Sequence, residues 1–156
     1  MEAIILSLGA SHVTTLEYGA IDCRHPKLST VTPQSMRLQV EKGQMPLFDG
    51  VVTYSSIEHS GLGRYGDALN PWGDILAVAR AGCLTKPEGF FAINVPIGRD
   101  QVVWNAHRFY GSKRLPLLMS NWKAIDAAEF SGNKGIDAVD ELNRIVEEIY
   151  AFRKIK

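Results

Sequence analysis

The chain has 156 residues, 46% of them apolar, and its 17 lysines and arginines balance its 17 aspartates and glutamates. A chain of this length buries roughly 70% of the surface that it exposes when unfolded, so it needs no disulfide or structural metal to fold. A net charge of zero removes the long-range attraction on which non-specific binding to nucleic acid or an anionic membrane depends. We therefore expect one domain, residues 1–156, that binds neither.

The first half of the chain is predicted to contain a helix and three strands. Residues 2–8 have apolar side chains at helical spacing, an acidic residue in the first turn and a glycine at the stop. Residues 12–18 and 29–32 are short runs of β-branched side chains, and a proline ends the second run. Residues 48–57 have apolar side chains on both faces, which is typical of a central strand. A polar, glycine-rich loop is expected at residues 60–72.

The second half continues the alternation of helices and strands. Residues 74–84 have apolar side chains at helical spacing, residues 86–89 predict a turn, and residues 90–95 predict a buried strand. A polar segment follows, and after it we expect a helix at 112–120 and a strand near 122–127.

The last stretch is ambiguous. Residues 139–149 have the spacing of an amphipathic helix, whereas residues 149–155 could form a terminal strand. In either case, strands that alternate with helices favour an α/β fold, a Rossmann-like and mostly parallel sheet with helices on both faces. Ligands of such sheets bind outside the carboxyl ends of the strands, so residues 17–18, 55–59 and 98–110 are the candidates for a site.

The cysteines and the amino-terminal residues predict a cytoplasmic protein. Cys23 and Cys83 lie far apart in a chain without an export signal, which is typical of reduced thiols. Residues 1–10 carry Glu2 where a signal peptide would carry lysine or arginine. No apolar run approaches the ~20 residues of a membrane-spanning helix, so no membrane partner is expected.

Glu17 ends the predicted strand 12–18 and has two possible roles. A carboxylate at the carboxyl end of a strand can accept hydrogen bonds from both hydroxyls of a ribose, as in nucleoside-cofactor sites. An acidic residue after a strand is also common as a solvated loop residue. The spacing alone leaves both interpretations open.

Residues 61–66 (GLGRYG) match the G-x-G-x-x-G pattern of dinucleotide-binding sites letter by letter. The true fingerprint turns directly from a strand into a helix, whereas here three residues intervene before the motif and the helix begins only near residue 74. We therefore predict no NAD site. The glycines more plausibly allow tight turns that place three loop side chains over a cleft, namely Arg64, Tyr65 and Asp67.

Two pairs of residues that follow neighbouring strands could perform acid/base chemistry. Glu58 and His59 follow the central strand, and His107 and Arg108 follow the next. A histidine beside a carboxylate can take up a proton near neutral pH, and Arg64 or Arg108 can bind an anionic substrate. The alternative is that His59 caps a strand end and His107 supports a loop. No metal site is predicted, because four residues lack the tight spacing of metal ligands: His59, Asp67, Asp74 and His107.

The chain resembles class I S-adenosylmethionine-dependent methyltransferases in four motifs that occur in the order and spacing of that superfamily. The motifs are residues 9–17 (GASHVTTLE), 48–52 (FDGVV), 55–59 (SSIEH) and 84–96 (LTKPEGFFAINVP), and the resemblance covers residues 1 to about 125. Two further segments are similar to a little-characterised branch of the superfamily, catalogued as a domain of unknown function, at residues 55–74 and 105–111.

The resemblance implies a role for each candidate residue. Glu17 corresponds to the acid that binds the ribose of S-adenosylmethionine, and Tyr54, Ser55 and Ser56 lie where the methionine end of this cofactor binds. Catalysis would fall to His59, with Glu58 beside it. The substrate would be bound by a further set of side chains: Arg64, Tyr65, Asp67, His107 and Arg108.

Two departures from the superfamily pattern affect the cofactor. Family members carry a first strand and a Gly-rich loop before the helix that begins here at Glu2, so the sequence resembles an N-terminally truncated domain in which cofactor binding is weak or lost. The acid that often follows the third strand is also missing, and only Gln34 or Gln39 could replace it. The absent strand predicts an open sheet edge, covered in a homodimer or filled by residues 149–155.

The function expected from the resemblance is transfer of a methyl group from S-adenosylmethionine to a small or sugar-like acceptor, at oxygen or nitrogen, with His59 as base. The alternative is a catalytically inactive protein that keeps the fold for binding or scaffolding. Cofactor binding distinguishes the two.

Overall fold

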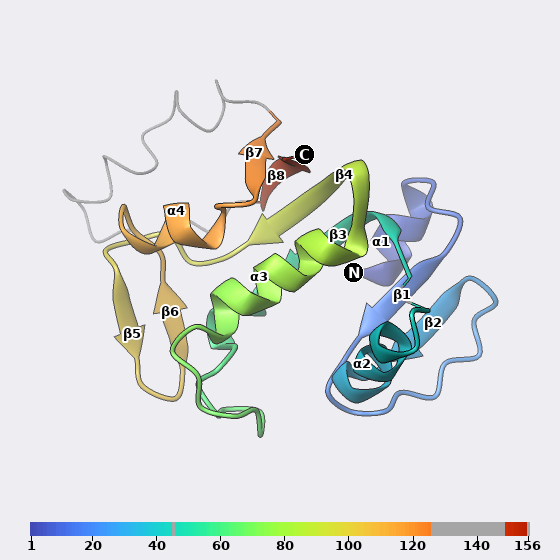
Figure 1. Cartoon of the computed structure of the whole chain (residues 1–156), viewed down its shortest axis with the longest axis horizontal. Coiled ribbons are helices and arrows are strands. Elements are labelled where there is room, and N and C mark those ends of the chain that lie inside the picture. Colours follow the sequence, from blue (N-terminus) through green and yellow to red (C-terminus); the bar gives the residue numbers. More distant parts are fainter. Residues whose placement is uncertain (45, 126–148, 156) are drawn as a thin grey trace. The chain divides into compact units, whose positions relative to one another are not determined.

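The structure is a computed structural model that describes residues 1–44, 46–125 and 149–155 (Figure 1). It shows a mixed α/β protein, in agreement with the predicted class at this level. The chain divides into two compact units, Met1–Pro46 and Leu47–Lys156, which are described one at a time.

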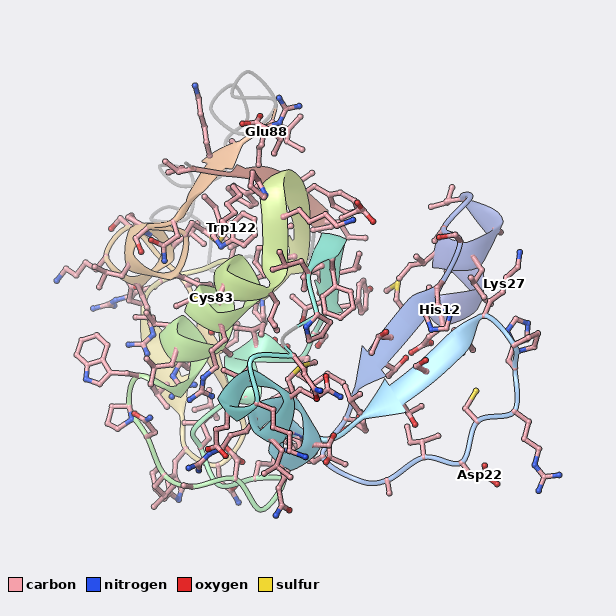
Figure 2. All side chains as sticks on the ribbon, turned by 45° about the vertical axis from the view of Figure 1, so that its right-hand side comes forward. His12, Asp22, Lys27, Cys83, Glu88 and Trp122 are labelled. Atoms are coloured by element: carbon pink, nitrogen blue, oxygen red, sulfur yellow. The ribbon has the colours of Figure 1, made fainter. Side chains whose placement is uncertain are left out.

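The amino-terminal unit contains two helices and one pair of parallel strands. Helix α1 (Glu2–Ser7) is followed by β1 (Val13–Leu16) and β2 (Leu28–Val31), all three within the predicted segments or one residue from them. The imidazole of His12, labelled in Figure 2, hydrogen-bonds to the hydroxyl of Ser29 on β2 (2.7 Å). Because β1 and β2 are parallel, their carboxyl ends meet at one edge, where Glu17 follows β1.

Helix α2 (Pro33–Glu41) was not predicted, because the proline was interpreted only as the end of a strand. In the structure Pro33 is the first helical residue, a position at which its missing N–H costs nothing. Thr32 caps the helix: its hydroxyl accepts from the N–H of Ser35 (3.2 Å), whose own hydroxyl accepts from the N–H of Thr32 (2.9 Å). The pattern of threonine, then proline, then serine is therefore a helix start.

The carboxy-terminal unit is built on a four-stranded mixed sheet. Its order is β3 (Phe48–Tyr54), β4 (Thr85–Asn94), β8 (Ile149–Lys154) and β7 (Trp122–Ala124). Strands β3 and β4 are parallel, whereas β8 runs antiparallel to both of its neighbours. The terminal segment is thus a strand. The prediction that residues 149–155 could fill a place beside β3 is wrong, because β8 pairs with β4 and β7.

The predicted turn at residues 86–89 is also wrong, because β4 continues through it. The pairing of β4 with β3 shifts register here, between Phe48 and Gly50, so the extra residues of β4 bulge out. Glu88 takes a positive φ of 61° within this bulge. The proline and glycine that suggested a turn are accommodated as a strand irregularity.

Helices α3 (Gly73–Leu84) and α4 (Arg114–Leu118) agree with the predicted helices, and α3 lies along the β3–β4 pair in Figure 1. A short 3₁₀ turn, η1 (Ile57–His59), follows β3. The segment expected to be polar and irregular contains an antiparallel hairpin, β5 (Gln101–Val103) and β6 (His107–Phe109). The hairpin was missed because each strand has only three residues, too few to show an alternating pattern.

The hydrophobic core of this unit lies between the sheet and helices α3 and α4. Trp122, labelled beside α3 in Figure 2, stacks on Phe91 of β4 with their ring centroids 4.9 Å apart. The buried cluster contains Val78, Phe91, Ile93, Val95, Ile97, Tyr110, Leu115, Leu118, Met119, Trp122 and Phe152. Among the described residues, none of the helices has the length and apolar character needed to cross a bilayer. Residues 126–148, which include most of the predicted terminal helix, lie outside the described residues.

Candidate functional site

The carboxyl end of β3 presents three consecutive exposed residues, Tyr54, Ser55 and Ser56. Ser55 has a φ of 45°, a left-handed conformation that non-glycine residues seldom adopt. Its N–H donates to the carbonyl of Asn94 (3.1 Å), which joins the end of β3 to the end of β4. Such backbone conformations cluster at functional sites, because the surrounding structure must hold them in place.

Glu58 and His59 follow on the η1 turn, and Ser55 connects them to the strand end. The hydroxyl of Ser55 donates to Oε1 of Glu58 (2.7 Å), and the same carboxylate oxygen lies 3.6 Å from Nε2 of His59. The Glu58 side chain is 1% exposed, whereas that of His59 is 16% exposed. Oε2 of Glu58 is buried and has no hydrogen-bond partner among the described residues. A ligand can therefore reach His59 more readily than Glu58.

The ring of His59 is held from its other side by the β5–β6 hairpin. Its Nδ1 lies 2.5 Å from the carbonyl oxygen of Ala106, in the turn between the two strands. A carbonyl oxygen can only accept, so Nδ1 carries a hydrogen and Nε2 of the neutral ring is left as an acceptor. Asn105 at this turn has a φ of 51°. Sequence reasoning missed Ala106 because its contribution is a backbone atom, which no residue pattern reveals.

Three of the predicted site residues lie near this histidine. The ring of Tyr65 meets the ring of His59 edge to face, with centroids 5.5 Å apart, and His107 lies 6.3 Å from His59 in the same manner. The guanidinium of Arg64 lies over the Tyr65 ring at 5.6 Å. The structure thus brings these predicted residues close to His59.

Asp67 was predicted to lie over the cleft with Arg64 and Tyr65, but its carboxylate is turned toward the backbone of its own loop. Its Oδ2 accepts from the N–H of Gly61 (2.5 Å), so it closes the loop that carries Arg64 and Tyr65. Its other oxygen is buried without a partner in the described part of the chain. This places Asp67 as a loop-shaping residue.

The side chain of Arg108 is 2% exposed, and its polar contacts are with other residues of the carboxy-terminal unit. One nitrogen of its guanidinium donates to the carbonyl of Ser60 (2.6 Å), and Nε lies 3.7 Å from the carboxylate of Asp74. Of the two arginines expected to bind substrate, Arg64 is the one on the surface.

Asp74 is the centre of a buried polar network. At the level of the sequence this residue was considered only as a possible metal ligand. Its side chain is 0% exposed. Tyr110 donates its hydroxyl to Oδ2 (2.9 Å), and Arg114 donates from Nε (2.9 Å) and from Nη2 (2.6 Å) to the two oxygens. The hydrogen bond to Asp74 raises the pKa of Arg114. The network joins α3 to β6 and α4.

Tyr110 makes the stability of this network depend on alkaline pH. Burial, followed by the negative charge of Asp74, raises the pKa of the Tyr110 phenol far above its usual range. Below the ordinary pKa of about 10 the phenol is protonated in both the folded and the unfolded chain, so its contribution to stability is complete. Above that pH only the unfolded chain loses the proton, so stability falls by up to about 1.4 kcal/mol per pH unit.

We therefore expect Tyr110→Phe to lose stability less steeply than the wild type between about pH 9 and pH 11. Urea denaturation at a series of pH values measures this slope. Tyr54→Phe is the matched control, because Tyr54 is 52% exposed and its variant should keep the wild-type slope. Equal slopes for wild type and Tyr110→Phe would show that the phenol is not held in its neutral form.

Glu17 lies in the amino-terminal unit. It follows β1 and is exposed. Its N–H donates to the carbonyl of Val31 (3.0 Å), and its Oε1 accepts from the N–H of Tyr18 (2.9 Å). Its second carboxylate oxygen has no hydrogen bond within the described residues, which leaves an acceptor at the carboxyl end of a parallel pair.

No group of three or more His, Cys, Asp and Glu side chains is placed to hold a metal ion in the parts of the chain that the structure describes.

The chain matches the model of the protein family described as "Caenorhabditis protein of unknown function, DUF268" over residues 1–151. No curated protein and no solved structure matches the chain. The match confirms the predicted likeness to a domain of unknown function. Because it covers almost the whole sequence, the chain belongs to the DUF268 family.

Proposed function

We propose that this chain is a class I S-adenosylmethionine-dependent methyltransferase domain that acts on a small or sugar-like acceptor. The observation that carries the proposal is the position of His59 and the hydrogen bond at its Nδ1. This histidine lies beyond the carboxyl end of a strand in a parallel pair, the usual place for a ligand in an α/β sheet. Its Nδ1–H is used by Ala106, so Nε2 can accept a proton.

The strand arrangement supports a Rossmann-like fold of this kind. Strands β1 and β2 form one parallel pair and β3 and β4 another, and α3 connects the second pair. Strand β8, the last in the chain, is antiparallel and lies between β4 and β7.

The residues present fit the cofactor at two places. Glu17 has a carboxylate oxygen without a hydrogen bond among the described residues, which suits a ribose hydroxyl. Tyr54, Ser55 and Ser56 are exposed at the carboxyl end of β3 and would contact the methionine end. When bound, S-adenosylmethionine supplies a methyl group that a nucleophile can displace from sulfur.

The chain's own contribution is to position the acceptor and to take its proton. A base is needed only for a nucleophile that begins protonated, and Nε2 of His59 is placed for that task. Protonation gives an imidazolium 3.6 Å from Oε1 of Glu58, whose negative charge stabilises it. Ser55 holds that carboxylate in place through its hydrogen bond. Glu58 thus acts through His59.

Replacement of Glu17 by glutamine tests the cofactor part of the proposal. The variant keeps the size of the side chain but removes the charged acceptor, so binding of S-adenosylhomocysteine should weaken by about 1.5–3 kcal/mol, or roughly 10- to 150-fold. Calorimetric titration of the full chain measures this. Glu41→Gln is the control, because Glu41 is exposed at the end of α2 and pairs with Arg37. Equal affinities for the two variants would remove Glu17 from the site. A wild-type chain without any binding heat would favour the scaffolding alternative.

A further inference from the structure

The polar atoms around His59 are arranged to receive a hydrogen-bond donor. Nε2 is an acceptor in the neutral ring, and the nearest charged atom, Oε1 of Glu58, is 3.6 Å away, too far for a hydrogen bond. That oxygen already accepts from Ser55, and it could not donate to Nε2 as a carboxylate. Nε2 therefore has no donor among the residues that the structure describes. A ligand that satisfies it must bring an O–H or N–H group.

Arg64, which also lies against the Tyr65 ring, supplies hydrogen-bond donors and a positive charge. It is exposed, and its guanidinium contacts the Tyr65 ring but forms no ion pair with any described residue. The other arginines of this region differ from it: Arg108 and Arg114 both face the carboxylate of Asp74. The donors of Arg64 remain available to an anion, which a guanidinium can bind in a bidentate manner.

A single aromatic ring links these two groups. The Tyr65 ring lies 5.5 Å from the His59 ring and 5.6 Å from the Arg64 guanidinium. A small molecule that lies against Tyr65 can therefore bring a hydroxyl to His59 and a negative charge to Arg64.

We propose that the acceptor of the proposed methyl transfer is a hydroxylated anion, with a hydroxyl at Nε2 of His59 and a phosphate or carboxylate at Arg64. The methyl transfer in this inference rests on the proposed function, whereas the binding of a hydroxylated anion does not. In that reaction the hydroxyl oxygen forms a bond to the methyl carbon as the bond from carbon to sulfur breaks, and that electron pair stays on sulfur. The hydroxyl proton moves to Nε2 of His59. The products are a methyl ether, S-adenosylhomocysteine and an imidazolium beside Glu58.

The test uses four probes with the full chain and no cofactor: glucose 6-phosphate, glucuronate, glucose and inorganic phosphate. Calorimetric titration should give at least tenfold tighter binding for one of the two sugar anions than for glucose or phosphate, and the tighter of the two identifies the anionic group. Nitrogen NMR of the histidine rings should show a shift at His59 with that sugar anion and none with inorganic phosphate.

Arg64→Gln should lower the affinity for the sugar anion at least tenfold, down to that of glucose. Arg99→Gln is the matched control, since Arg99 is also exposed but precedes β5 in the chain, and it should bind as the wild type does. Equal affinities for the two variants, or equal binding of phosphate and the sugar anions, would overturn the inference. A sugar anion that binds while S-adenosylhomocysteine does not would leave this site in place and defeat the methyltransferase proposal.

Discussion

Replacement of Asp74 by asparagine is expected to lower the free energy of unfolding by about 3–5 kcal/mol, the cost of breaking a buried ion pair from one side. The aspartate is fully buried, and its two oxygens accept three hydrogen bonds from Tyr110 and Arg114. Arg108, itself 2% exposed, lies 3.7 Å from the same carboxylate. The neutral amide would remove the ion pair that the structure shows for Arg108 within the described residues.

Urea denaturation of Asp74→Asn against the wild type measures this loss. Asp49→Asn is the matched control, because Asp49 also pairs with a cation, Lys86 at 2.7 Å, but its side chain is 87% exposed. The control should change stability little, since an exposed ion pair is screened by water. A similar small effect for Asp74→Asn would show that the Asp74 network does not hold this unit together.

Replacement of Gly61 by alanine is expected to cost about 2–5 kcal/mol, because it combines backbone strain with a steric clash. Gly61 has a φ of 79°, a conformation that L side chains rarely adopt. A Cβ at this position would overlap the carbonyl oxygen of Asn70. That carbonyl cannot easily move, because it accepts from the N–H of Gly73 (3.0 Å) and lies 3.4 Å from the Arg108 guanidinium.

Gly66→Ala separates the two causes. Gly66 has a similar φ of 84°, but a Cβ there would meet nothing within 4 Å. It should cost only the strain, about 1–2 kcal/mol. Thermal or urea denaturation of the two variants gives the difference, which is the cost of the clash. If both variants lose the same stability, the close packing of Gly61 against Asn70 is not what this loop requires.

These two glycines explain why the G-x-G-x-x-G pattern resembles a dinucleotide fingerprint without its context. The pattern selects positions of positive φ and close backbone approach, and a long surface loop needs the same properties as a phosphate-binding turn. In this chain the loop joins η1 to α3, and Asp67 closes it on Gly61. The letters alone could not distinguish the two structures.

Much of the secondary structure could be predicted because its signals are local. The apolar runs that became β3 and most of β4, and the helical spacing that became α3, each lie within one segment. The sheet partners of β8 could not be predicted, because pairing with β4 and β7 depends on contacts between residues far apart in the chain. The bulge at Glu88 likewise depends on which strand lies beside it.

The candidate site was predictable in part for the same reason. His59, Tyr65 and His107 follow strands that end at a common edge, and the structure brings their rings together. The role of Arg108 could not be predicted, because its burial depends on the loop carbonyls and on Asp74. Ala106 contributes only a carbonyl, so no side-chain pattern identifies it.

The central claim is that the carboxyl end of β3 belongs to the cofactor site of a methyltransferase domain. Amide NMR of the full chain during titration with S-adenosylhomocysteine tests it most directly. The account predicts saturable shifts at Tyr54, Ser55 and Ser56, at His59, and around Glu17, with the core of α4 unaffected. Shifts confined to other segments, or a spectrum that does not change at millimolar ligand, would contradict it.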